Sequence, residues 1–123
     1  MRSIKQSKIS IHKLPLVPNI CRQLLREVWK SKNASIAHVS MRLGNVSLLH
    51  KHKNFTELYY ILSGKGIMTL GDNSFKVQAD DLVVIPPHKP HKLKNDGKTN
   101  LIHLVIASPP FNPKDVILIK DNA

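Results

Sequence analysis

The chain has 123 residues, a formal net charge of +11 and one cysteine, Cys21. This length predicts one domain over residues 1–123, with a core at about 34–120 and an N-terminal arm or strand at 1–33. A lone cysteine excludes an internal disulfide and suits a reducing compartment. No apolar stretch is long enough to cross a membrane and no signal-peptide pattern is visible, so we expect a cytoplasmic protein without a membrane partner.

The positive charge requires a nucleic-acid partner to be considered. The lysines and arginines are spread from Arg2 to Lys120, without a basic run of five or more. Aromatic residues make up 5% of the chain, which is too few for a platform that stacks on bases. We therefore expect a lysine-rich solvated surface and no specific nucleic-acid partner. The alternative, a nucleic-acid binder, predicts an affinity that falls steeply with salt.

The first third of the chain gives a weak structural signal. The region up to Pro18 is polar and basic, and it suggests an added edge strand or a loose arm. Residues 21–29 show some helical spacing over too short a stretch to decide between a turn of helix and a strand that enters a barrel. From Ala34 onward the pattern is typical of β-structure, beginning with a segment that ends at Gly44.

Short strand-like segments then follow one another closely, separated by glycine- or proline-rich turns. The predicted segments are 46–52, 58–62, 67–70, 75–77, 82–85, 101–107 and 116–119. Segment 82–85 is continuously apolar and looks buried. We expect Met41, Met68 and Phe75 to line the interior. Many short strands without a long helical pattern predict an antiparallel sandwich or barrel.

Three histidines and a glutamate form the most informative pattern. His50 and His52 are two residues apart, so on a strand both imidazoles lie on one face. Glu57 follows a loop-like stretch and can face the same interior if the chain reverses there. His91 follows the proline-rich turn at 86–90, a rigid place from which to aim a ligand. Imidazoles with a carboxylate are a ligand set for Fe, Mn, Ni, Zn or Cu.

The two stretches resemble the two motifs of the cupin superfamily. The first has Gly44, His50, His52, Glu57 and Gly64 at the spacing of the family. The second motif retains Pro86, His91 and Asn95 at the spacing of the family. It departs where the family has glycine, because Asp80 and His88 stand there. If the turn at His88 requires a positive φ, glycine would adopt it readily, whereas histidine tolerates it only moderately.

This resemblance implies a small single-domain cupin of the conserved-barrel type, which is all-β with little helix and folds as a double-stranded β-helix, or jelly roll. It also implies one divalent metal ion per chain, without choosing among Fe, Mn, Ni, Zn and Cu. By resemblance, the ligands are His50, His52, Glu57 and His91. Small cupins often pair, so we expect a homodimer.

The function predicted from the resemblance is a metalloenzyme that acts on a small organic molecule, of dioxygenase, isomerase or lyase type. The alternative is a non-catalytic module that binds metal and a small ligand. Lysines flank both motifs and lean the prediction toward an anionic substrate if they line the mouth of a pocket. These are Lys51, Lys53, Lys89, Lys92 and Lys94.

Two further residues are candidates for a catalytic role. Tyr59 shares the strand face of Glu57 and could act as an acid, a base or a substrate contact, although a packing role is the simpler interpretation. His103 alternates with Leu101 and Val105, and it would lie next to the metal ligands if that face points inward. His88 is expected to be a solvated loop residue.

Overall fold

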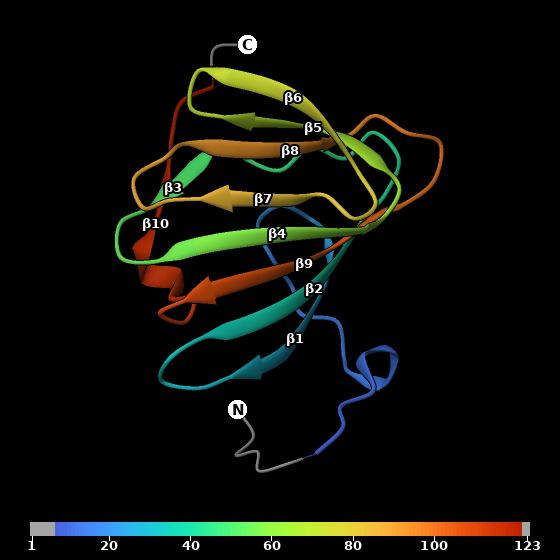
Figure 1. Ribbon diagram of the computed structural model, residues 1–123, viewed down its shortest axis with the longest axis vertical. Helices are drawn as coiled ribbons and strands as arrows, with labels where there is room; N and C mark the ends of the chain where they lie inside the picture. The colour runs from blue at the N-terminus through green and yellow to red at the C-terminus, as the bar shows by residue number, and fades with distance from the viewer. Residues whose placement is uncertain (1–6, 122–123) are drawn as a thin grey trace.

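The computed structural model describes residues 7–121, which fold almost entirely as β-structure (Figure 1). Two short 3₁₀ turns, η1 (Ile11–Lys13) and η2 (Pro113–Asp115), accompany the strands. The strands are β1 (Leu24–Lys30), β2 (Ser35–Met41), β3 (His50–His52), β4 (Thr56–Ser63), β5 (Lys65–Leu70), β6 (Asn73–Gln78), β7 (Leu82–Ile85), β8 (His91–Asn95), β9 (Leu101–Ser108) and β10 (Val116–Leu118).

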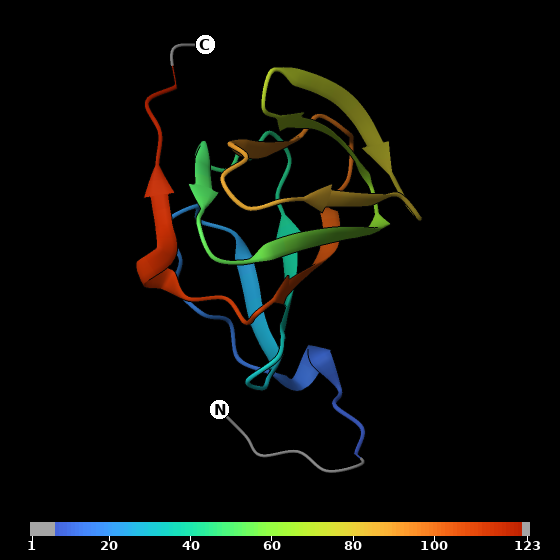
Figure 2. The same ribbon diagram turned by 60° about the vertical axis from the view of Figure 1, so that its left-hand side comes forward.

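The strands form two five-stranded antiparallel sheets that face each other (Figures 1 and 2). The β4 sheet has the order β1-β2-β9-β4-β7, and the β3 sheet has the order β10-β3-β8-β5-β6. The chain passes repeatedly from one sheet to the other, as in a double-stranded β-helix. The predicted all-β jelly-roll barrel is therefore confirmed.

Alternation along the strands explains how the barrel closes on an apolar interior. In β4, Glu57, Tyr59 and Ile61 are buried, whereas the residues between them are only partly covered. The strand ends at Gly64, where a φ of +91° turns the chain into β5. A side chain rarely adopts this conformation, so the glycine of the first motif has a structural reason.

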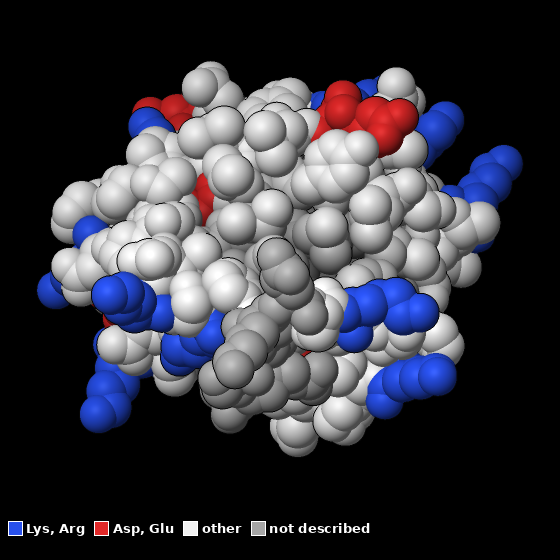
Figure 3. Space-filling model, turned by 60° about the horizontal axis from the view of Figure 1, so that its bottom comes forward, with Lys and Arg blue, Asp and Glu red and all other residues white. Residues whose placement is uncertain are grey.

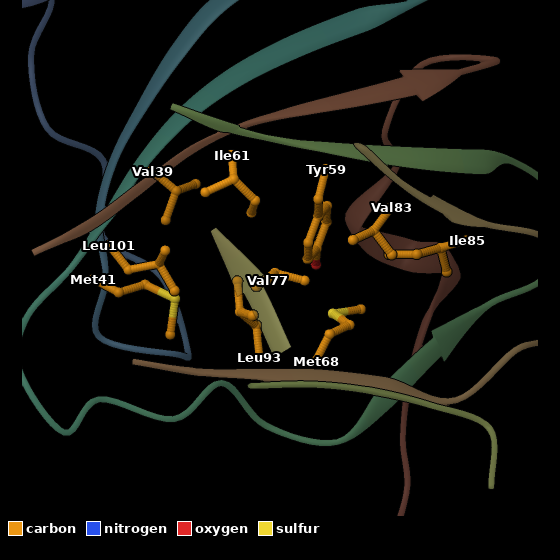
Figure 4. Close-up of a cluster of buried hydrophobic side chains, with 10 residues drawn as sticks. All are labelled: Val39, Met41, Tyr59, Ile61, Met68, Val77, Val83, Ile85, Leu93 and Leu101. Atoms are coloured by element: carbon orange, nitrogen blue, oxygen red, sulfur yellow. The ribbon is translucent and has the colours of Figure 1, made fainter. Parts of the chain in front are cut away.

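The core fills the space between the sheets (Figure 4). The buried cluster consists of Val39, Met41, Tyr59, Ile61, Met68, Val77, Val83, Ile85, Leu93 and Leu101. Met41 and Met68 are fully buried, as the sequence predicts. Phe75 is different: it shares the face of Val77, but it lies nearer the start of the edge strand β6 and remains 40% exposed.

Several element boundaries differ from the sequence expectations. Of the two alternatives for residues 21–29, the structure has the strand that enters the barrel, with its bounds shifted to Leu24–Lys30. Only residues 50–52 of the expected segment 46–52 form a strand. The segment expected to be a buried strand, 82–85, exists as β7, but Leu82 and Val84 are 54% and 53% exposed because they point out of the barrel.

The N-terminal region contacts the edge of the β4 sheet. Val17 forms an isolated bridge with Leu25 of β1, and the Arg26 side chain donates a hydrogen bond to the Leu14 carbonyl. Part of the predicted arm and domain lies outside the described residues, namely 1–6 and 122–123. Between residues 7 and 121, no helix is long and apolar enough to cross a membrane.

Both departures from the second motif keep a left-handed backbone. Asp80 has a φ of +72° and His88 a φ of +68°. The side chain of Asp80 accepts a hydrogen bond from the Tyr60 hydroxyl at 2.8 Å, which offsets part of the strain. The turn at His88 is closed by its backbone N–H, which donates to the His52 carbonyl at 2.6 Å. The turn geometry that glycine permits thus exists here without glycine.

Candidate metal centre

The four candidate ligands come from three strands and from both sheets. His50 and His52 lie on β3, and His91 begins β8 directly opposite His50. Glu57 lies on β4 in the other sheet, paired with Ile85. The loop 53–55 reverses the chain, so Glu57 faces the histidines across the end of the barrel.

The ligand atoms of these residues converge on one point. One nitrogen or oxygen atom from each of the four lies within 4.8 Å of the others. Glu57 Oε1 is 3.2 Å from His52 Nε2 and 3.3 Å from His91 Nε2. These contacts lack hydrogen-bond geometry, so all three atoms are buried without a hydrogen-bond partner among the described residues. Such atoms are costly to bury unless a further group satisfies them.

Backbone carbonyls orient two of the imidazoles. His50 Nδ1 lies 2.7 Å from the Leu48 carbonyl oxygen, and His91 Nδ1 lies 2.9 Å from that of Lys89. Because a carbonyl only accepts, Nδ1 carries the proton in both rings. Nε2 is then left with a free lone pair, which is the form in which histidine binds a metal.

His52 is held differently. Its Nδ1 is buried and has no hydrogen-bond partner in the described part of the chain. Instead, its ring packs against Phe55 at a centroid distance of 4.5 Å and meets the edge of Phe111 at 6.2 Å. Aromatic packing rather than a hydrogen bond therefore sets the orientation of this imidazole.

The donor set fits a divalent ion. Ligand atoms bind such ions at about 2.1 Å, so ligands on opposite sides of an ion are about 4.2 Å apart. The four ligand atoms lie within 4.8 Å of one another, which is close to this separation. Three imidazoles and one carboxylate suit a transition metal and leave coordination positions for water or substrate. The cluster could thus bind a metal ion.

Burial favours the neutral form of two of the imidazoles, those of His50 and His52. It lowers the pKa of His50 to about 4, with a smaller contribution from the neighbouring His91. Burial also lowers the pKa of His52, although the nearby Glu57 carboxylate opposes this. Because a protonated imidazole cannot bind a metal, these shifts favour metal binding near neutral pH.

Tyr59 lies next to the ligands on the inner face of the β4 sheet, and His103 lies beside Tyr59 on the same face, without a direct contact to a ligand among the described residues. The Tyr59 ring is 6.0 Å from that of His91 and 4.9 Å from that of His103, centroid to centroid. Burial, the charge of Glu57 and a hydrogen bond with its carboxylate raise the pKa of Tyr59. Burial lowers the pKa of His103 to about 3, and its Nδ1 has no partner among residues 7–121.

Two surface cavities flank the ligands without including them. The first, of about 710 Å³, contains Lys89, Lys92 and the exposed His88. The charge of Lys92 is paired with Asp121. The second, of about 410 Å³, lies behind His52 and includes Phe55 and Phe111. Of the flanking lysines, the structure thus brings Lys89 and Lys92 to the wall of a cavity.

Most of the groups that hold the ligands could not be predicted from the sequence. The carbonyls that orient His50 and His91 belong to residues whose side chains are irrelevant to this role. Phe111 reaches His52 from a segment 59 positions later. Phe55, inside the first motif, carries a usable signal because it is the one large apolar residue of an otherwise polar loop.

Comparison with known proteins identifies the family. The family model of the cupin domain matches residues 37–107, which is more than half of the chain and includes all four candidate ligands. The chain belongs to the cupin family.

Individual relatives agree with this assignment. The chain is 38% identical over 103 residues to an uncharacterized protein from Methanocaldococcus jannaschii, covering 83% of this chain and 82% of that protein. It is 29% identical over 83 residues to an oxalate-binding protein from Thermotoga maritima, covering 68% and 69%. KdgF from Halomonas sp. has a similar fold, with a TM-score of 0.80, 16% identity and coverage of 89% and 98%.

Proposed function

We propose that His50, His52, Glu57 and His91 bind one divalent metal ion and that the chain uses this site to act on a small anionic organic molecule. The observation that carries the proposal is the convergence of buried ligand atoms that have no hydrogen-bond partner among the described residues. Fe, Mn, Ni, Zn and Cu all suit the donor set. Dioxygenase, isomerase and lyase chemistry are the candidate reaction types.

A bound ion would act as a Lewis acid that holds a substrate oxygen or, if it is iron, as a redox centre. The side chains of the protein would supply the proton chemistry. Tyr59 remains protonated at neutral pH and can donate a hydrogen bond toward the ligands. His103 remains neutral, so its unpaired ring nitrogen can donate or accept a hydrogen bond. We propose these two residues as the catalytic side chains.

The anionic substrate class is supported by two observations. Lys89 and Lys92 line the cavity beside the ligand strands, although Asp121 pairs with one of them. The similarity to an oxalate-binding protein suggests a small carboxylate. The name of that relative also favours a second candidate function, a module that binds metal and ligand without turnover.

Metal analysis of protein purified without chelator tests the site. The His50→Ala/His52→Ala double variant should lose the ion. The matched control is His12→Ala/His88→Ala, which removes two exposed histidines, and it should retain the ion. Equal metal content in the wild type and the His50/His52 variant would show that the site assignment is wrong.

Turnover assays on small acids, sugars and diketones separate the two candidate functions. An enzyme should convert at least one of them in a metal-dependent manner, and Tyr59→Phe or His103→Gln should slow that reaction while the ion stays bound. If the fully metallated chain binds a ligand tightly but converts none, the binding module is the better description.

We further propose that the chain forms a cytoplasmic homodimer and has no specific nucleic-acid partner. The single cysteine supports a reducing compartment. In the view of Figure 3, the Lys and Arg side chains lie toward the sides of the molecule rather than in one stripe. Two adjacent apolar side chains on β7, Leu82 and Val84, are exposed and could pack against a second copy.

A further inference from the structure

The loop between His52 and Glu57 is fixed by a carboxylate from the other end of the sequence. Asp115 Oδ2 accepts hydrogen bonds from the backbone N–H groups of Lys53 at 3.1 Å and Asn54 at 2.8 Å. Its Oδ1 accepts from the Asn54 side-chain amide at 3.1 Å. One side chain thus satisfies three donors in a loop of three residues.

Asp115 is itself firmly placed. It is 7% exposed and ends η2, whose start is capped by the Asn112 side chain accepting from the Lys114 N–H. The next residue begins β10, which pairs Val116 with His52. The same segment therefore holds both the strand that carries two ligands and the loop that follows it.

The loop matters because His52 depends on it. His50 and His91 are each oriented by a carbonyl two residues earlier in the chain, but His52 lacks such a partner in the described structure. Its ring packs instead on Phe55, which is 2% exposed and belongs to the loop that Asp115 caps. Loss of the cap would free Phe55 and remove the support of His52.

Glu57 depends on the same loop. It stands five positions after His52, so strand alternation alone would turn it to the opposite face. The reversal at Lys53 and Asn54 corrects the direction, and the buried carboxylate of Asp115 stabilises this reversal. A carboxylate that accepts backbone N–H bonds forms strong, charge-assisted contacts.

We propose that Asp115 is a positioning residue of the metal centre, which orients His52 through Phe55 and directs Glu57 toward the other ligands. The inference rests on the proposed metal-binding function. It adds a residue that lies outside both motifs and outside the matched region 37–107. Mutation of a group that orients a metal ligand without binding the ion typically lowers metal affinity by about 10- to 100-fold.

Titration of the full chain with Co²⁺ tests this role, because the visible spectrum of the bound ion reports its ligand geometry independently of protein stability. Asp115→Asn keeps the size of the side chain but replaces one acceptor oxygen by a donor. We expect it to weaken Co²⁺ binding about 10-fold or more and to alter the spectrum of the bound ion. Circular dichroism at the titration temperature would verify that the variant is folded.

The matched control is Asp81→Asn. Asp81 Oδ2 also accepts a backbone hydrogen bond, from the Gln78 N–H at 2.8 Å, but it lies in the turn between β6 and β7. This variant should keep the affinity and spectrum of the wild type. If Asp115→Asn does not fold, Phe55→Leu is the second test. It removes the ring packing on His52 and leaves the loop hydrogen bonds in place, and it should also weaken Co²⁺ binding.

The outcomes separate the inference from the function on which it rests. Wild-type affinity and spectrum in Asp115→Asn would overturn the positioning role, as would an unchanged Phe55→Leu if the first variant is unfolded. An equal loss in Asp81→Asn would also overturn it, since the effect would then be general. Failure of the wild type to bind Co²⁺ would instead overturn the proposed metal site itself.

Discussion

The backbone of His88 is left-handed although its side chain is exposed. A non-glycine residue in this region costs about 1–2 kcal/mol, and glycine avoids most of this cost. Because the turn is closed by the backbone N–H of His88, a glycine retains that contact.

We therefore expect His88→Gly to raise the free energy of unfolding by about 1 kcal/mol. Asp80→Gly should gain less, because it removes the carboxylate that accepts the Tyr60 hydroxyl hydrogen bond. Urea unfolding of the metal-free chain measures both effects. A loss of stability in His88→Gly would show that the imidazole makes a contact that outweighs the backbone strain.

His103 couples stability to pH. Burial lowers its pKa in the folded chain to about 3, against an ordinary value of about 6.5. Below pH 6.5 the unfolded chain therefore binds a proton that the folded chain does not, so stability falls as the pH falls from 6.5 toward 3.

Between about pH 7 and about pH 5 this residue should lower the free energy of unfolding by about 2 kcal/mol. In the metal-free chain, His103→Gln should reduce the loss of unfolding free energy between about pH 7 and about pH 5 by about 2 kcal/mol, whatever it does to overall stability. Denaturant unfolding at several pH values measures this loss. Equal losses in the two proteins would mean that His103 is not buried in its neutral form.

At the scale of the elements, the turn between β4 and β5 holds a glycine at a position with no room for a Cβ atom. A Cβ atom at Gly64 would lie 2.6 Å from the Asn100 carbonyl oxygen and 2.9 Å from the Leu101 Cα. Gly44 also has a positive φ, +75°, but a Cβ there meets nothing within 4 Å.

Gly64→Ala should accordingly destabilise the chain by about 3 kcal/mol or more, whereas Gly44→Ala should cost about 1 kcal/mol from backbone strain alone. Thermal unfolding of both variants provides the comparison. Similar costs would indicate that β4 and β9 can move apart at Gly64 to make room.

The strands could be predicted from the sequence where local signals are strong. Residues 82–85 are bounded by Pro86, and β4 ends at a glycine turn, so both were found within one or two residues. Strand β8 was missed because its charged and apolar residues follow a proline-rich turn and its pairing with β5 is not local. The short length of β3 also depends on distant partners, β8 and β10, rather than on its own residues.

The candidate ligands could be predicted because all four lie in two short motifs with a defined spacing. Their supporting contacts could not, because Asp115 meets Lys53 across 62 positions of sequence. Likewise, the inward direction of His103 follows from the register of β9 against β4, in which it pairs with Ile61. Local patterns do not specify this register.

At the scale of the whole molecule, the outer surface of the β4 sheet is the surface that we propose for packing in the homodimer. The continuous apolar run 82–85 predicts burial on both faces of β7, yet Leu82 and Val84 are exposed in the single chain. Neighbouring outward residues on β4 and β9 are also apolar, including Leu58 and Leu104.

We expect the wild type to sediment as a dimer and Leu82→Lys/Val84→Lys to sediment as a monomer, since two added charges would face each other across an apolar contact. Leu43→Lys, an exposed leucine outside the β4 sheet, is the control and should leave the mass unchanged. A monomeric wild type would contradict the dimer.

The distribution of the candidate ligands over two sheets has a mechanical consequence. Glu57 belongs to the β4 sheet and the three histidines belong to the β3 sheet, so an ion held by all four would join the sheets at one end of the barrel. The apolar cluster around Ile61 and Leu101 joins them farther along. Removal of the ion by a chelator should therefore speed amide hydrogen exchange in β3 and at the start of β4, while β9 stays protected. The two sheets would then separate locally at the ligand end and stay packed elsewhere.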